Sequence, residues 1–341
     1  MIEKGYVFGM KKHKGFIITI LVILLLISFC AGLLFGSVNL QLTDIFSCLS
    51  GRNTNQTAYV LLTAVRLPRV IGGLLAGMGL ACAGVILQGV MNNSLASPNT
   101  IGVNSGSGFA VMMCLLLFPD RYYLQPVFAF TGALLTTLAV FCLAYFADSS
   151  RTTIILAGIT ISSFLNAGVN TIKLLNTDIT LNLTSFLIGS LSGLTLNKLL
   201  LPGLCILAAF LISLFFAQPL NILGLGDDIA GSLGLRVSFT RFTLLILSSI
   251  MAGCVVSYAG LLSFIGLIVP HICRQLFGND ARFLLPCSAL LGASFVILCD
   301  LLGRMLAAPF ELPAGIIMAF IGGPFFLYLL LKKKGGRRVH A

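Results

Sequence analysis

Nine long apolar runs divide this chain and limit the folds that it can adopt. A membrane-spanning helix needs about 20 predominantly apolar residues, and most of the runs approach or exceed that length. With 58% hydrophobic and only 9% charged residues, and a mean hydropathy of +1.05, the chain has too little polar surface for a soluble protein. The sequence therefore predicts an all-α, polytopic membrane protein. The runs cover 16–35, 70–90, 101–118, 124–146, 153–175, 199–216, 242–272, 283–302 and 312–331.

The seventh run is long enough to hold two crossings. Arg241 and Arg274 bracket it, and no charged residue lies between them. If this run crossed only once, the basic segments that follow it would fall on the wrong side of the membrane. We therefore expect a turn near 257–260, with two crossings of about 16 residues each, just under the usual length. This gives ten transmembrane helices in a single domain, 1–341.

The basic residues give this topology a direction. With ten crossings, fourteen of the 21 Lys and Arg residues fall on the side of the two chain ends, which the positive-inside rule assigns to the cytoplasm. We therefore expect a multi-pass protein of the bacterial cytoplasmic membrane, in contact with lipid and with both termini cytoplasmic. The net charge of +11 is explained by this orientation, so no nucleic-acid partner is expected.

Several kinds of chemistry are not predicted for this chain. It contains no G-x-x-x-x-G-K-[ST] motif, so it is not expected to bind ATP-Mg by that route. Its ten cysteines form no C-x-x-C pair and nearly all lie inside apolar runs, which favours small buried side chains over metal ligands. We therefore expect no metal site, no cofactor in this chain and no enzyme activity.

Two arginines mark the outer end of the second run. Arg66 and Arg69 flank Pro68, and because proline suits the first turn of a helix, the helix is predicted to begin there. Both arginines would then oppose the positive end of the helix dipole, which suggests a role other than helix stability. Contact with lipid headgroups and docking of an acidic partner remain equally open.

The last two runs carry three further features. Asp300 and Arg304 are four residues apart, a spacing that predicts a local ion pair. Glu311 precedes Pro313 at the start of the last helix, where a carboxylate is favourable and is interpreted as structural. The segment 322–324, Gly-Gly-Pro, is expected to break and kink that helix.

The longest polar segment on the inner side covers about 218–241. Asp227 and Asp228 could begin a short helix that ends near Gly234. Such a helix would offer a contact to a cytoplasmic partner, although an ordinary loop is an equal alternative.

Taken together, the motifs resemble those of the FecCD family, the permease subunits of ABC importers for ferric siderophores, haem and vitamin B12. The resemblance covers nearly the whole chain. It implies the type II ABC importer permease fold, used as a homo- or heterodimer with two cytoplasmic ATP-binding subunits and an extracytoplasmic binding protein. The motifs are RLPR at 66–69, the segment 88–106, GSLG at 231–234, FIGLIVPHICR at 264–274, Asp300 to Arg304, and ELPAGI and IGGPFF near the end.

The resemblance also implies roles for individual residues. Arg66, Arg69 and Arg304 would bind carboxylates of the binding protein. For Arg304, the resemblance therefore favours docking over a local ion pair with Asp300. The ATPase-coupling residues would be Asp227, Asp228, Gly231, Ser232, Leu233, Gly234 and Leu235. Inner-face or gate residues would be Asn92, Asn93, Ser94, Pro98, Gly322, Gly323 and Pro324. Ser94 stands where the family usually has proline, which suggests a looser turn.

Two other functions fit the sequence less well. An ion-coupled secondary transporter would usually need a carboxylate or an unwound ion site at mid-membrane, and no acidic residue is expected there. An intramembrane enzyme is disfavoured because the sequence contains no paired nucleophile and base.

Overall fold

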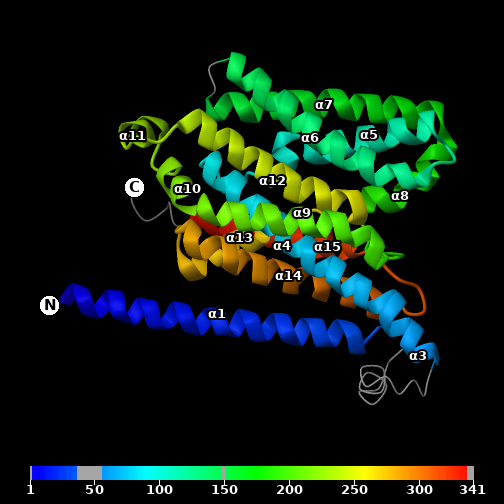
Figure 1. Cartoon of the computed structure of the whole chain (residues 1–341), viewed down its shortest axis with the longest axis horizontal. Coiled ribbons are helices and arrows are strands. Elements are labelled where there is room, and N and C mark those ends of the chain that lie inside the picture. Colours follow the sequence, from blue (N-terminus) through cyan, green and yellow to red (C-terminus); the bar gives the residue numbers. More distant parts are fainter. Residues whose placement is uncertain (1, 37–55, 148–149, 336–341) are drawn as a thin grey trace.

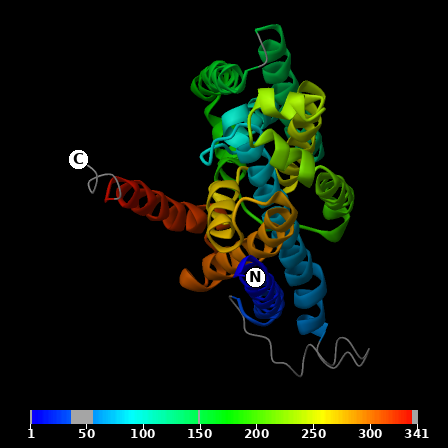
Figure 2. The ribbon, with the colours of Figure 1, turned by 90° about the vertical axis from the view of Figure 1, so that its left-hand side faces the viewer.

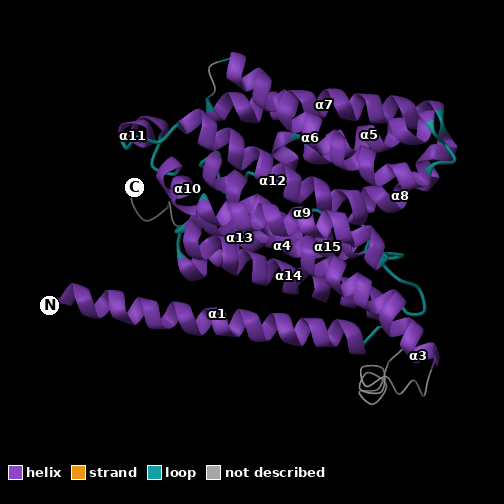
Figure 3. Cartoon of the chain, viewed as in Figure 1, coloured by secondary structure: helices purple, strands orange, loops and turns teal. Residues whose placement is uncertain are grey.

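The computed structural model describes residues 2–36, 56–147 and 150–335, and within these ranges all regular structure is helical (Figure 3). Seven helical segments are long and apolar enough to cross a membrane, and three shorter apolar helices accompany them. Together they match the ten predicted crossings. The helices are α1 (Ile2–Leu34), α3 (Gln56–Val60), α4 (Leu67–Val90), α5 (Val103–Leu117), α6 (Gln125–Phe146), α7 (Arg151–Leu175), α8 (Thr177–Ile188), α9 (Leu196–Phe215), α10 (Ala217–Leu223), α11 (Asp227–Ser232), α12 (Val237–Ala259), α13 (Ile265–Phe277), α14 (Ala281–Leu306) and α15 (Ala314–Gly335).

Helix α4 lies at the centre of the bundle (Figure 1). In the apolar stretch of the span that contains it, 89% of the residues are buried, compared with 17% in each of the spans of α1 and α7. Glycines allow its neighbours to approach closely. A Cβ atom on Gly77 would lie 2.0 Å from the carbonyl oxygen of Gly292 in α14, and one on Gly84 would lie 2.0 Å from that of Gly266 in α13. Such backbone contacts are typical of membrane helices, which pack through small residues.

The turn expected within the seventh run is present. Helix α12 ends at Ala259, and Gly260 has a φ of +71° that redirects the chain. The two helices are unequal, however: α12 has 23 residues and α13 has 13. The first crossing begins earlier than the charge pattern suggested, because Arg241 lies inside α12 and is buried.

Pro68 lies in the first turn of α4, as predicted, but the helical segment does not begin there. The chain is continuously helical from Gln56 to Val90, and a π-helical turn over 61–66 precedes α4. Proline lacks an N–H and its ring clashes with the carbonyl group one turn earlier. A wider π turn ahead of Pro68 accommodates both effects. Arg66 and Arg69 therefore lie well inside a long helical segment, and the dipole argument does not apply to them.

The bundle has two distinct ends. Helix α11, the beginning of α1 and the end of α15 lie at one end, which we call the inner end after the predicted topology (Figure 1). Arg66 and Arg304 lie at the opposite end, which we call the outer end. Helix α15 diverges from the other helices toward the inner end and projects from the side of the bundle (Figure 2).

Candidate functional site

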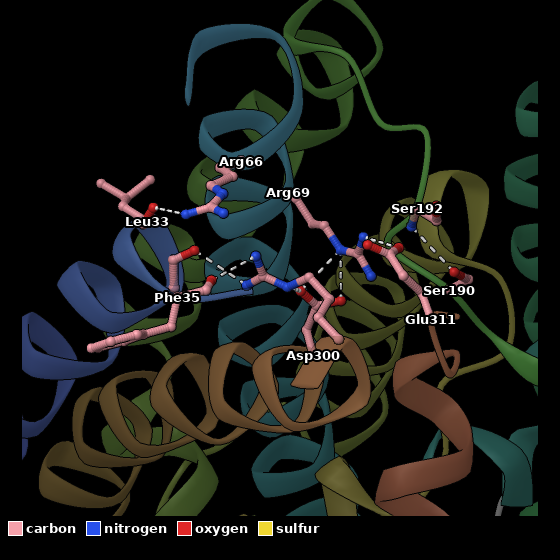
Figure 4. Close-up of polar contacts among 10 residues, drawn as sticks. Leu33, Phe35, Arg66, Arg69, Ser190, Ser192, Asp300 and Glu311 are labelled. Atoms are coloured by element: carbon pink, nitrogen blue, oxygen red, sulfur yellow. Dashed lines mark hydrogen bonds and ion pairs between the residues drawn. The ribbon is translucent and has the colours of Figure 1, made fainter. Parts of the chain in front are cut away.

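Five charged side chains gather at the outer end (Figure 4). We call Arg66, Arg69, Asp300, Arg304 and Glu311 the outer charge cluster. Nε of Arg69 donates to Oδ1 and Oδ2 of Asp300 at 2.9 and 3.0 Å, and its Nη1 donates to Oε2 of Glu311 at 2.6 Å. Nε of Arg304 lies 3.1 Å from Oδ2 of Asp300. The predicted ion pair between Asp300 and Arg304 is thus confirmed, and Asp300 joins two arginines rather than one.

Most of this cluster is removed from water. The side chains of Arg69, Asp300 and Arg304 are 3–4% exposed, whereas that of Glu311 is 33% exposed. A buried charge costs several kcal/mol unless it is paired and hydrogen-bonded. Asp300 therefore stabilises both guanidinium groups, and through them it connects α4, α14 and the segment before α15. Glu311 contributes by binding Arg69, not by occupying the first turn of α15, which begins three residues later.

Two arginines of the cluster also cap the outer end of α1. Nη1 of Arg66 donates to the carbonyl oxygens of Leu33 and Leu34 at 2.6 and 2.7 Å. Arg304 donates to those of Gly32 and Phe35 at 3.2 and 3.3 Å. The last carbonyl groups of a helix have no partner within the helix, and arginine side chains can satisfy them. The outer charge cluster thus fixes α1 to the bundle as well.

All three arginines that the resemblance assigns to docking therefore lie together. They are also buried, with Arg66, Arg69 and Arg304 3%, 4% and 3% exposed. Their guanidinium groups are directed at acceptors within the chain. A carboxylate of another protein would have to displace some of these acceptors to bind them.

At the inner end, the short helix predicted between Asp227 and Gly234 is present as α11. Gly234 has a φ of +82°, and the N–H of Leu235 donates to the carbonyl oxygen of Ala230 at 3.0 Å. This is the Schellman arrangement that ends many helices. The exposed residues of α11 are Asp228, Ile229, Gly231 and Ser232, and Leu233 directly after the helix is exposed as well.

Asp227 anchors α11 to the bundle. Its carboxylate accepts hydrogen bonds from Arg151, the first residue of α7, at 2.9 Å and from Arg241 of α12 at 2.7 and 2.8 Å. Burial raises the pKa of Asp227, but the hydrogen bonds and positive charges of Arg241 and Arg151 outweigh burial and set that pKa below its usual range. The carboxylate is therefore ionised at neutral pH and holds α11 against the inner ends of two spanning helices.

The loop that follows α4 is a defined turn. Asn92 has a φ of +47°, and the N–H of Asn93 donates to the carbonyl oxygen of Gln88 at 3.1 Å. This closes α4 in the same Schellman manner, and asparagine tolerates the left-handed conformation better than most residues. The side chain of Asn93 also accepts from the N–H of Leu95 at 2.9 Å.

The looser turn suggested for Ser94 is not observed. The N–H of Ala96 donates to the carbonyl oxygen of Asn93 at 3.0 Å, so the turn over 93–96 is closed. Ser94 occupies its second position, where proline is favoured but not required. Pro98 lies beyond this turn, buried at the start of a 3₁₀ turn over 98–101.

Asn92, Asn93 and Ser94 line a cavity of about 450 Å³ at the inner end, together with residues of α4, α10, α13 and α14. Arg274 reaches into it and donates to Oε1 of Gln88. The cavity joins the loop after α4 to the segment that carries α11. Gly322, Gly323 and Pro324 do not line it, so the predicted gate residues fall in two separate places.

The expected break at Gly322, Gly323 and Pro324 is absent. Helix α15 runs through all three residues without interruption. Gly322 is buried and in contact with Phe264, whereas a Cβ atom on Gly323 would meet nothing within 4 Å. The two adjacent glycines therefore have different surroundings.

Helix α7 presents an exposed polar face that the sequence analysis missed. Thr160, Ser163, Asn166 and Asn170 are all exposed, and their spacing of three and four residues places them along one side of the helix, which they share with the exposed Leu156 and Leu174. Exposing the amides of Asn166 and Asn170 to lipid would be costly because they would lack hydrogen-bond partners, so this face is expected to meet a partner or a water-filled cavity. In the sequence, the three-to-four-residue spacing of these polar residues could have predicted this face.

Among the residues that the structure describes, no group of three or more His, Cys, Asp or Glu side chains is placed to hold a metal ion.

Comparison with known proteins places this architecture in a family. The model of the FecCD transport family matches residues 24–332. YfmE, a permease protein of an Fe(3+)-citrate import system of Bacillus subtilis, is 38% identical over 315 residues, covering 91% of this chain and 92% of the relative. HmuU, a hemin transport system permease protein of Yersinia pestis, is 35% identical over 330 residues, covering 95% and 96%.

A solved structure agrees with this assignment. It shows an inward-facing conformation of an ABC transporter assigned to the metal-chelate type, with a TM-score of 0.81 and 30% sequence identity. The match covers 93% of this chain and 99% of that one. The chain therefore belongs to the FecCD transport family.

Proposed function

We propose that this chain is the membrane permease subunit of an ABC importer that carries a ferric chelate or haem into the cell. Relatives named for Fe(3+)-citrate and hemin support this cargo class. The structural observation that carries the proposal is the exposed polar face of α7. It offers hydroxyl and amide groups but no carboxylate, which suits a conduit of low affinity better than a site that would capture iron from its chelator.

The proposed assembly contains two permease subunits, identical or related, that meet along α7. Two ATP-binding subunits would bind the inner end through the exposed face of α11 and would supply ATP-Mg and its hydrolysis. An extracytoplasmic binding protein would deliver the chelate to the outer end. Both termini would then be cytoplasmic.

A substitution on α7 tests the conduit. Asn166→Leu together with Asn170→Leu should reduce uptake of the chelate by about tenfold, because leucine offers no hydrogen bonds along the pathway. The amount of folded protein should not fall, since both side chains are exposed. Leu156→Ile, at another exposed position of α7, serves as the control. Unchanged uptake in the double variant would contradict a pathway along this face.

We further propose that the outer charge cluster receives carboxylates of the binding protein. Arg66 and Arg304 now donate to carbonyl groups of α1, and a carboxylate is a stronger acceptor than a carbonyl. On docking, these two arginines would therefore donate to carboxylates of the binding protein instead of to the carbonyl groups of α1. Arg69, held by both Asp300 and Glu311, would instead keep the cluster assembled.

Replacing Arg66 by glutamine tests docking without reversing a buried charge. Glutamine can still donate to a carbonyl group of α1, but it lacks the positive charge. Binding-protein affinity for the permease in nanodiscs should fall about tenfold or more, the value of a charge-assisted hydrogen bond. Arg121→Gln, which alters an exposed arginine in the connection between α5 and α6, should have little effect. Equal affinities for wild type and Arg66→Gln would exclude Arg66 as a docking residue.

A further inference from the structure

The connection between α12 and α13 is non-helical backbone inside the bundle. Residues 260–264 contain no helix, yet the N–H of Leu261 donates to the carbonyl oxygen of Phe186 at 2.9 Å. Two residues after this connection, Gly266 packs directly against Gly84 of the central helix α4. Irregular backbone at membrane depth is tolerated only where protein or a water-filled cavity surrounds it. This connection therefore lies inside the bundle, where protein surrounds it.

Phe264 ends this connection in an unusual conformation. Its φ of +69° lies in the left-handed region, which is a true outlier for a bulky side chain. Strained residues of this kind persist only where their surroundings hold them, and they gather at functional sites. Phe264 also caps α13, because its carbonyl oxygen accepts from the N–H groups of Leu267 and Ile268 at 3.0 and 2.9 Å.

The ring of Phe264 is held by a notch in α15. A Cβ atom on Gly322 would lie 2.3 Å from Cγ of Phe264 and 2.6 Å from its Cδ1. Only glycine therefore leaves room for the ring at this position. Next to it, the rings of Phe264 and Phe326 lie 6.2 Å apart, which is contact distance for aromatic side chains.

This contact lies where α15 leaves the bundle. Gly322 is buried, and no described residue of α15 after Gly322 is buried. The rest of the helix projects from the bundle (Figure 2). Pro324 follows two residues later and removes one hydrogen bond of the helix ladder. The direction of the projecting part is therefore set at the contact between Phe264 and Gly322.

We propose that Phe264 is a positioning residue that fixes the angle of the inner half of α15, and that this half turns about the Gly322 notch during transport. The transport part of this proposal rests on the proposed function. The connection 260–264 is the part that can change conformation, because its strained backbone at Phe264 can relax when the ring leaves the notch. The two orientations of α15 would then differ in whether the ring of Phe264 packs against Gly322.

Two adjacent glycines provide a matched pair of variants. Gly322→Ala places a methyl group in the notch, so the ring or the helix must move by about 1 Å to restore ordinary contact. Gly323→Ala adds the same methyl group to open space. Phe264→Ala removes the ring and leaves the notch empty.

The angle can be measured in the full-length permease in nanodiscs. Spin labels are introduced as non-canonical amino acids at Leu276 of α13 and Leu331 of α15, both exposed. Gly322→Ala should shift the main distance by about 2 Å or more, since the label at Leu331 lies about two and a half turns beyond the notch. Phe264→Ala should broaden the distribution, and Gly323→Ala should match the wild type. ATP-dependent uptake of ferric citrate or haemin should fall about tenfold in Gly322→Ala and in Phe264→Ala.

The outcomes separate the two proposals. If Gly322→Ala and Phe264→Ala lower the yield but leave the distances of the folded protein as in Gly323→Ala, Phe264 is a packing residue and the inference is wrong. If the distances change but the wild type takes up no chelate in the presence of ATP, the positioning role stands and the proposed function fails.

Discussion

Asp300→Asn is expected to destabilise the protein by about 3–5 kcal/mol, the cost of breaking a buried ion pair. The variant keeps the shape of the side chain but removes its charge. Arg69 and Arg304 would then face each other across a neutral amide, with both side chains only 4% exposed. The loss should extend to α1, because Arg304 also binds the carbonyl groups at its outer end. Unfolding of the purified permease in detergent, followed by circular dichroism, measures this effect.

Glu311→Gln is the matched control. It makes the same chemical change in another carboxylate that binds Arg69, but the side chain of Glu311 is 33% exposed. Water can replace its interactions, so the expected cost is about 1 kcal/mol or less. Equal effects of the two variants would show that the burial of Asp300 does not determine the stability of the cluster.

Asp227→Ala is expected to separate ATP hydrolysis from transport. The variant removes the carboxylate that connects α11 to Arg151 and Arg241, so movement of α11 would be transmitted to α7 and α12 less directly. Uptake should fall about tenfold, a usual size for coupling between two sites, while the assembled complex continues to hydrolyse ATP. The measurement is the ratio of chelate molecules imported to ATP molecules hydrolysed in proteoliposomes.

Arg282→Ala serves as the control for this experiment. It breaks the ion pair between Arg282 and Asp280 at the same end of the bundle, but the side chain of Arg282 is 61% exposed. Such surface pairs contribute little, so the transport ratio should stay at its wild-type value. A wild-type ratio in Asp227→Ala as well would show that Asp227 does not transmit the coupling.

The ion pairs at the two ends of the bundle join different sets of helices. The outer charge cluster joins α1, α4, α14 and the segment before α15, whereas Asp227 joins α7, α11 and α12. The first set surrounds the proposed docking surface, and the second includes both the proposed coupling helix and the polar face of α7. A signal from α11 would therefore reach the pathway helix directly.

The features predicted correctly depend on short stretches of sequence. Hydropathy located the spans, and the positions of Arg241 and Arg274 predicted that the seventh run turns back. Gly234 indicated the end of α11 because glycine readily adopts the left-handed conformation. The spacing between Asp300 and Arg304 predicted their ion pair. Each of these signals depends either on residues within one or two helical turns of each other or on the requirement that the chain cross a membrane.

The features that were missed depend on contacts between distant segments. Arg69 binds Asp300 and Glu311, which are 231 and 242 residues away in sequence, and no local pattern connects them. Pro68 is a common start signal, but the π turn before it allows the helix to begin at Gln56. Nothing in the segment around Phe264 predicts a left-handed phenylalanine, whose ring packs against Gly322 in a helix distant in sequence.

The central claim is that this chain forms the membrane pathway of an ATP-driven importer of ferric chelates. The most direct test places the permease, its ATP-binding subunits and its binding protein in proteoliposomes and follows radiolabelled ferric citrate and haemin. Uptake is expected to require both the binding protein and ATP on the side of α11, and to persist when ion gradients are collapsed. Uptake driven by an imposed proton or sodium gradient without ATP would contradict the claim.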